Sequence, residues 1–157
     1  HKSLLAFIQP MQRQAFTQQL FTRIAFNLLV ENGDAHLKNF GLIYARPEAA
    51  ALAPVYDVLT TTCFPGLAND APALPLDGRK VWDDWTGFTR VAVARGLRPA
   101  EVRALLLHLA QGLRANRGLA AEYTARVPGA LSVLAGMEAA WQRGLQRLES
   151  HLQLGSG

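Results

Sequence analysis

Three long stretches of the chain place apolar residues at intervals of three or four, and this spacing limits the folds open to it. Such spacing gathers apolar side chains on one face of an α-helix. We therefore predict helices over residues 12–31, from Pro99 onwards and over residues 131–152, packed around one core. The stripes are Phe16, Leu20, Ile24 and Leu28; Val102, Leu105, Leu106, Leu109 and Leu113; and Leu131, Leu134, Met137, Trp141, Leu145, Leu148 and Leu152.

Between the first two helices the pattern changes to short apolar runs and turns. Residues 40–44 and 52–56 are apolar runs separated by the turn-like Arg46-Pro47-Glu48, which predicts a β-hairpin. Residues 60–80 contain several Pro and Gly residues and are predicted to be irregular. The predicted fold class is mainly α, with one small hairpin.

Length and composition favour a single domain over residues 1–157. With 157 residues, 50% of them hydrophobic, the chain can close one core and little more. No apolar run reaches the roughly 18 residues that a membrane span needs, and HKSLLAFIQP lacks the pattern of a signal peptide. The lone Cys63 excludes an internal disulfide and is expected to be a half-buried thiol. We expect a cytoplasmic protein without a membrane partner.

The net charge of +4 raises the question of nucleic-acid binding. Residues 86–157 hold nine Arg and four Glu, but these arginines are spread singly along the predicted helices. Solvated helix faces give the same pattern, so direct nucleic-acid binding is not predicted.

A polar loop, NGDAHLKN, follows the first predicted helix. We expect Gly33 to end that helix by taking the left-handed conformation. Because a hairpin returns its chain to where it began, Asp57 should lie near Asn39, with Asp34 close by. Amide and carboxylate oxygens of this kind suit Mg²⁺, which takes its other contacts from water and substrate phosphates.

The spacing Asp-x-x-x-x-Asn has a chemical use. In protein kinases such a loop supplies a carboxylate for the acceptor hydroxyl and a metal-binding amide, and a later Asp holds the other metal. Here Asp34, Asn39 and Asp57 match those three positions. The pattern predicts metal-assisted phosphoryl transfer.

Each of these residues also has a plainer interpretation. Asp34 or Asn39 could satisfy backbone groups of the loop. His36 could bind zinc together with Asp34, or make structural hydrogen bonds. Lys38 could contact the transferred phosphate or neutralise the carboxylates. Tyr56 and Phe40 are expected to fix the loop by packing.

Another acidic pair, Asp83-Asp84, lies between Trp82 and Trp85. Paired carboxylates serve acid–base catalysis in glycosidases. Adjacent side chains usually point apart, however, and a surface turn is the preferred interpretation.

Two segments, FNLLVENGDAHLKNFGLIY and LAPVYDVLTT, resemble the HipA family of bacterial toxin kinases. Members carry an Asn-x-Asp-x-His-x-Lys-Asn segment followed by a Pro-x-Tyr-Asp segment. The match runs from Phe26 to about Thr62, and residues 73–92 with the helices beyond fit more loosely.

The resemblance implies the carboxyl-terminal lobe of a serine/threonine protein kinase that uses ATP and Mg²⁺. It implies Asp34 as catalytic base and Asn39 and Asp57 as metal ligands, with His36 and Lys38 as candidate nucleotide contacts. It further implies a toxin-antitoxin system with a HipB-like DNA-binding antitoxin as partner. The implied substrate is a translation component such as an aminoacyl-tRNA synthetase.

The sequence departs from a whole kinase in one respect. It has no Gly-x-Gly-x-x-Gly loop, and its only lysines are Lys2, Lys38 and Lys80. We therefore expect the nucleotide-gripping amino-terminal lobe to be absent, in an excised or a naturally split protein. Two rival interpretations stay open: a non-catalytic module that docks an antitoxin or regulator, and a metal-dependent phosphohydrolase.

Overall fold

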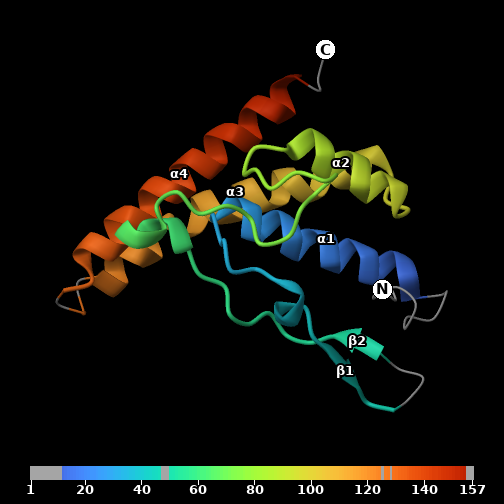
Figure 1. The fold of residues 1–157 in the computed structure, drawn as a ribbon, viewed down its shortest axis with the longest axis horizontal. Helices are drawn as coiled ribbons and strands as arrows, with labels where there is room; N and C mark the ends of the chain where they lie inside the picture. The colour runs from blue at the N-terminus through green and yellow to red at the C-terminus, as the bar shows by residue number, and fades with distance from the viewer. Residues whose placement is uncertain (1–11, 47–49, 125, 128, 155–157) are drawn as a thin grey trace.

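The computed structural model describes residues 12–46, 50–124, 126–127 and 129–154 (Figure 1). Within these residues the chain forms four α-helices and one two-stranded antiparallel sheet. The helices are α1 (Arg13–Leu29), α2 (Trp85–Ala94), α3 (Pro99–Thr124) and α4 (Leu131–Leu154). The three long helices predicted from the apolar stripes are confirmed, and so is the mainly helical class.

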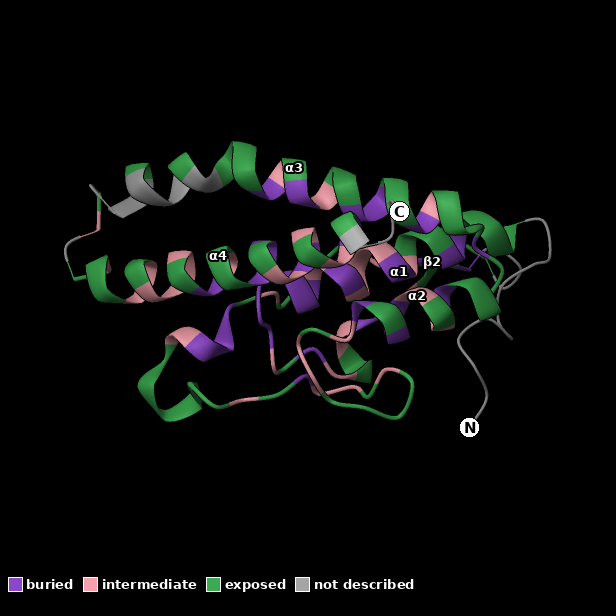
Figure 2. Cartoon of the chain, turned by 90° about the horizontal axis from the view of Figure 1, so that it is seen from above, coloured by how far each residue is buried: buried purple, intermediate pink, exposed green. Residues whose placement is uncertain are grey.

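The helices share one core. Figure 1 shows α3 and α4 lying side by side along the length of the molecule, with α1 against them. Figure 2 shows the buried faces of these helices turned toward one another and the exposed faces turned outward. The core includes Phe21, Ala25, Leu28 and Leu29 of α1, Val102, Leu105 and Leu106 of α3, and Leu145 and Leu148 of α4.

Helix α2 is an element that the stripe analysis missed. Asp84 caps its first turn, because the Asp84 carboxylate accepts a hydrogen bond of 2.9 Å from the backbone N–H of Gly87. Trp85 and Phe88 are buried, with ring centroids 5.9 Å apart in an edge-to-face arrangement. The cap gives Asp84 a structural role, and the buried Trp85, Phe88 and Ala92 form a short apolar stripe along this ten-residue helix.

The predicted hairpin is confirmed, but its second strand lies earlier than expected. Strands β1 (Leu42–Tyr44) and β2 (Ala50–Leu52) pair with Leu42 opposite Leu52. The expected strand over residues 52–56 is wrong, because β2 ends at Leu52 and, after the hydrogen bond from Ala53 to the Gly41 carbonyl, Pro54 has no amide hydrogen to continue the ladder. Part of the predicted turn, residues 47–49, lies outside the described residues.

The hairpin is held against α1 by a small apolar cluster. Phe16 of α1 packs with Ala50 and Leu52 of β2, and all three are buried. This contact fixes the direction in which the hairpin leaves the bundle, and therefore where the chain returns after it.

Residues 60–80 are largely irregular, as predicted. They contain two short 3₁₀ turns, η4 (Thr61–Cys63) and η5 (Pro65–Leu67), and an isolated bridge between Leu76 and Arg79. Cys63 is half-buried, as expected, and burial raises the pKa of its thiol. Figure 1 shows the η4 turn lying against α4.

No helix in the described part of the chain has the length and apolar character needed to cross a membrane. Residues 1–10, for which no signal peptide is predicted, lie outside the described residues.

Candidate functional site

The end of α1 turns the chain into the polar loop through a left-handed residue. Glu31 has a φ of 55°. The backbone N–H of Glu31 bonds to the carbonyl of Leu28 at 3.3 Å, and that of Asn32 bonds to the carbonyl of Asn27 at 2.9 Å. This pair of bonds closes a helix around a left-handed residue. The expectation that Gly33 supplies that conformation is wrong, because Glu31 supplies it two residues earlier.

Gly33 is required for a different reason, which is space. A Cβ atom at this position would lie 2.0 Å from the carboxylate of Asp70 and 2.8 Å from Oγ1 of Thr61. The backbone N–H of Gly33 also donates to Thr61 Oγ1 at 2.8 Å. The polar loop is therefore in direct contact with the segment that follows Asp57.

The candidate base, Asp34, presents its carboxylate to solvent. Its side chain is 59% exposed, and its backbone N–H donates to Oδ1 of Asn32 at 3.1 Å. Asn32, and not Asp34, thus supplies the side-chain cap within this turn. An exposed carboxylate on a short, hydrogen-bonded loop is accessible to a hydroxyl group of another molecule.

His36 lies beside Asp34. Its Nε2 is 3.6 Å from the Asp34 carboxylate, which is longer than a hydrogen bond. Its Nδ1 is buried and has no hydrogen-bond partner within the described residues. The described residues also contain no group of three or more His, Cys, Asp or Glu side chains placed to hold a metal. A zinc site built on His36 and Asp34 would therefore need further ligands of another kind.

Asn39 and Asp57 are brought together as predicted. The side-chain amide of Asn39 donates to the Asp57 carboxylate at 2.7 Å and lies 3.5 Å from the Asp57 carbonyl. Asn32 also reaches that carbonyl, at 3.4 Å. Asp57 has a φ of 56°, a left-handed conformation that Asp tolerates better than most residues. The return of the chain after β2 places the two side chains in contact.

The chemistry of this pair fits a hard cation. Asn39 Oδ1 and the second carboxylate oxygen of Asp57 accept no hydrogen bond from the described part of the chain. Carboxylate and amide oxygens are the ligands that Mg²⁺ takes from proteins, with water and phosphate completing its shell. Within the described residues, Asp34 contacts neither Asn39 nor Asp57. Of the three predicted oxygen-bearing side chains, Asn39 and Asp57 are therefore in direct contact and Asp34 stands apart.

Phe40 packs beneath the polar loop, as expected, whereas Tyr56 is exposed and contacts the loop through a hydrogen bond. The hydroxyl of Tyr56 donates to the backbone carbonyl of Lys38, and a Cβ atom on Gly41 would lie 3.1 Å from that hydroxyl. Phe40 is buried. The side chain of Lys38 is exposed and stands on the same turn, Leu37–Asn39, as Asn39 itself.

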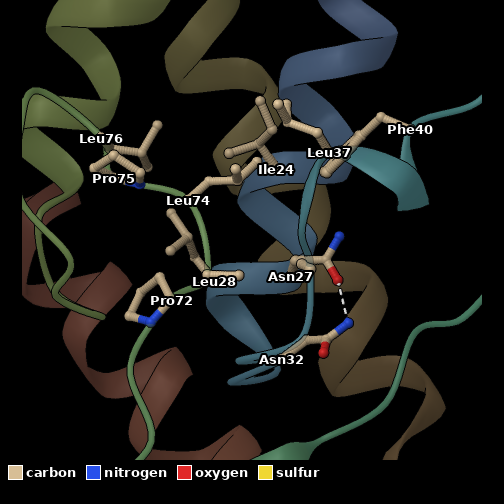
Figure 3. A pocket seen from close by; sticks show the side chains of 12 residues that line it. Ile24, Asn27, Leu28, Asn32, Leu37, Phe40, Pro72, Leu74, Pro75 and Leu76 are labelled. Carbon is tan, nitrogen blue, oxygen red and sulfur yellow. Dashed lines mark hydrogen bonds between the residues drawn. The ribbon is translucent and has the colours of Figure 1, made fainter.

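An apolar pocket of about 240 Å³ lies beside the loop (Figure 3). Figure 3 shows Leu28 and Asn27 of α1 on one side and Leu74 and Pro75 of the irregular segment on the other. Its polar members are already paired, since Asn32 donates to Asn27 at 2.7 Å. Among the described residues, the pocket is lined by Ile24, Asn27, Leu28, Asn32, Ala35, Leu37, Phe40, Pro72, Ala73, Leu74, Pro75 and Leu76.

Sequence reasoning missed the residue at the junction of these segments, Glu31. Its side chain is 2% exposed, and it is bound by Arg143, Arg147 and Thr62. Burial acts to raise the pKa of Glu31, but these hydrogen bonds together hold the pKa below its ordinary value. The available signal was the spacing of Arg143 and Arg147, four residues apart on one predicted helix. Arginines on a solvent-exposed helix face have the same spacing, so the signal did not point to Glu31.

The family model for the HipA-like C-terminal domain matches residues 1–117, and the chain belongs to this family. The polar loop, the hairpin and Asp57 all lie inside the matched region. Helix α4 lies outside it.

Relatives of the chain carry kinase names. It is 38% identical over 64 residues, 40% of its length, to a Haemophilus influenzae protein named "Putative kinase". It is 46% identical over 43 residues to "Putative kinase Y4dM" and 42% identical over 50 residues to "Putative kinase Y4mE", both of Sinorhizobium fredii. These two matches cover 27% and 32% of the chain.

The aligned stretches make up a small part of each relative. They cover 19% of the Haemophilus protein and 10% and 12% of the two Sinorhizobium proteins. The family assignment therefore depends on the match to residues 1–117, and the relatives add only their kinase names.

Proposed function

We propose that this chain is the lobe of a HipA-like serine/threonine protein kinase that aligns the acceptor hydroxyl and holds the metal-bound phosphates. The reaction is transfer of the terminal phosphate of ATP to a protein hydroxyl. The single observation that supports it best is the 2.7 Å contact between Asn39 and Asp57, at the end of a loop that also carries Asp34.

In this proposal Asp34 is the catalytic residue. Its exposed carboxylate accepts a hydrogen bond from the substrate hydroxyl and takes the proton as the oxygen attacks the terminal phosphorus. The bond from that phosphorus to the bridging oxygen breaks, and ADP leaves. Asp34 therefore needs access to a polypeptide, which its exposure provides.

Asn39 and Asp57 are the proposed ligands of Mg²⁺. When bound, the ion neutralises the charge that develops on the phosphate oxygens. The residues' own contribution is geometric, because their hydrogen bond fixes the two oxygen ligands relative to each other before nucleotide arrives. The exposed Lys38 and the neighbouring His36 are the proposed contacts to the nucleotide phosphates.

The rest of the proposal concerns the whole protein. An amino-terminal nucleotide-gripping lobe, a HipB-like DNA-binding antitoxin and an aminoacyl-tRNA synthetase substrate are the partners that the family resemblance implies. A cytoplasmic toxin-antitoxin setting is part of the same proposal. The small share of each relative that the chain aligns with leaves room for such a lobe.

A second candidate function is docking without catalysis. The hairpin and the segment after it expose several large apolar side chains, among them Ile43, Tyr44, Val55 and Phe64, each at least 42% exposed. Large exposed apolar side chains mark interaction surfaces when they form a patch, and Ile43 and Tyr44 are consecutive residues of β1. In this alternative the polar loop only stabilises the hairpin.

Titration calorimetry with ATP and Mg²⁺ tests the proposal, first on this chain and then on the full-length protein. We expect magnesium-dependent ATP binding in the full-length protein, and transfer of labelled phosphate to a protein acceptor. Release of free phosphate with no acceptor present would instead favour the phosphohydrolase. Absence of both binding and transfer in the full-length protein would overturn the kinase proposal and favour docking.

A further inference from the structure

Glu31 occupies a position at which its residue type is unfavourable. It follows α1 in the left-handed conformation, with φ 55°, where glycine is the usual residue because it has no Cβ to clash. Its carboxylate is also buried, at 2% exposure, where an unpaired charge is strongly destabilising. A residue that is costly on both counts needs specific partners to hold it.

The two charged partners come from α4, more than 100 residues away in the sequence. Arg143 donates to the two carboxylate oxygens of Glu31 through Nε at 3.2 Å and Nη2 at 2.6 Å, and Arg147 donates to Oε1. Thr62 supplies a further hydrogen bond to Oε2. Two positively charged guanidinium groups and one hydroxyl thus supply hydrogen bonds to both oxygens of the carboxylate.

The backbone of Glu31 binds the other site segment. The N–H of Thr61 donates to the Glu31 carbonyl at 3.1 Å, and Thr61 Oγ1 lies 3.2 Å from the same carbonyl. Thr61 Oγ1 also accepts from Gly33, at the start of the loop that carries Asp34. Thr61 lies four residues after Asp57, so these bonds set the loop and the Asp57 segment against each other.

Helix α4 also contacts the Asp57 segment and the end of α1 directly. Trp141 donates through Nε1 to Thr60 Oγ1 at 2.9 Å. Gly144 lies against the end of α1, where a Cβ atom would come 1.9 Å from the Leu29 carbonyl. This close approach lets both Arg143 and Arg147 reach Glu31.

We propose that Glu31, clamped by Arg143 and Arg147, is a positioning residue that sets the loop of Asp34 and Asn39 in register with the Asp57 segment. The proposal rests on the proposed function and extends it to α4, which lies beyond the residues matched by the family model. None of the three charged residues touches the reacting groups, and each acts through the bonds that join Glu31 to Thr61 and Thr62 and Thr61 to Gly33.

The test compares Glu31→Gln with a matched control in the full-length protein. Glu31→Gln keeps the shape of the side chain and removes its charge. The control is Arg114→Gln. It removes the ion pair between Arg114 of α3 and Glu149 of α4, neither of which contacts the polar loop. Arg143→Lys is the conservative variant, because it keeps the positive charge but loses the planar fork through which Arg143 binds both carboxylate oxygens.

The first readout is catalytic. With folding verified by circular dichroism, we expect Glu31→Gln to weaken Mg²⁺ affinity in the presence of ATP and to lower kcat by about 10- to 100-fold, as removal of outer supporting partners does at other metal sites. KM for the protein acceptor should stay unchanged. Arg143→Lys should fall between Glu31→Gln and the wild type, and Arg114→Gln should match the wild type. Wild-type values in folded Glu31→Gln would overturn the proposal.

The second readout does not depend on catalysis. The nuclear magnetic resonance signals of the Asn39 side-chain amide and the Asp57 backbone amide report the contact between them in the chain itself. We expect both signals to shift in Glu31→Gln and neither to shift in Arg114→Gln. If the wild type neither binds ATP nor transfers phosphate but these signals still shift, the proposed function fails and the positioning role stands. Unshifted signals in folded Glu31→Gln would overturn the positioning role.

Discussion

The side-chain amide of Asn39 donates a hydrogen bond of 2.7 Å to the carboxylate of Asp57, across the whole of the hairpin that separates them. The hairpin begins after the polar loop, and its second strand returns the chain to that loop. Two oxygen-bearing side chains 18 positions apart therefore become neighbours. The charge and conformation of Asp57 can be separated experimentally, because Asn also tolerates the left-handed backbone.

Asp57→Asn is therefore expected to abolish magnesium-dependent ATP binding while leaving the fold intact. The substitution removes the negative charge that Mg²⁺ prefers and keeps the size of the side chain. Calorimetry of ATP with and without Mg²⁺ measures the effect. The matched control is Asp77→Asn, another left-handed Asp that pairs with Arg90 on α2. Equal ATP affinity in Asp57→Asn and the wild type would contradict a metal role.

Asp34→Asn should lower the rate of phosphate transfer by about 10²- to 10⁴-fold, the usual contribution of a general base. ATP binding should be unchanged, because the exposed Asp34 carboxylate contacts neither Asn39 nor Asp57 in the described structure. Single-turnover transfer to a protein acceptor separates the two effects. Asp83→Asn, at another exposed Asp, serves as the control, and a parallel loss of ATP binding in Asp34→Asn would argue for a metal ligand instead.

Gly144→Ala should destabilise the fold by about 1–3 kcal/mol, the usual cost of forcing an added group into a packed interior. The new methyl group would lie 1.9 Å from the Leu29 carbonyl, so α4 would have to move away from α1. Gly112→Ala in α3 is the matched control, because its Cβ meets no atom within 4 Å. That control should stabilise the helix by about 0.5–1 kcal/mol. Urea unfolding of both variants measures the difference, and equal stability would contradict the close approach.

Stability should fall in acid partly through Glu31. Burial acts to raise its pKa, but hydrogen bonds from Arg143, Thr62 and Arg147 outweigh burial and leave the pKa below its ordinary value of 4.5. The unfolded chain therefore binds this proton more readily than the folded chain does. The stabilising contribution is complete above pH 4.5 and is lost as the pH falls below it, through the folded-state pKa.

The measurement is thermal unfolding of the wild type and Glu31→Gln across this acidic range. The gap between their melting temperatures should narrow as the pH falls, because the wild type loses its ionised carboxylate. A gap that stays constant would show that the charge of Glu31 contributes nothing to folding.

Much of the fold could be predicted because its signals are local. The three apolar stripes predicted α1, α3 and α4, since helical spacing is written into neighbouring residues. The proximity of Asn39 and Asp57 followed from the geometry of one hairpin. The second strand was predicted a few residues too late, because Pro54 within residues 52–56 has no amide hydrogen for the ladder, whereas Ala50 and Leu52 of β2 pack against Phe16 of α1.

The sequence by itself determined the helical class, the hairpin and the family, because each depends on residues close together along the chain. Only the tertiary structure decided that Glu31 carries the left-handed turn and is clamped by α4. Glu31 lies 112 and 116 positions from Arg143 and Arg147, and no local pattern marks such a pair. The clamp forms because Gly144 allows α4 to approach α1 closely, and this fit depends on the shapes of two packed helices.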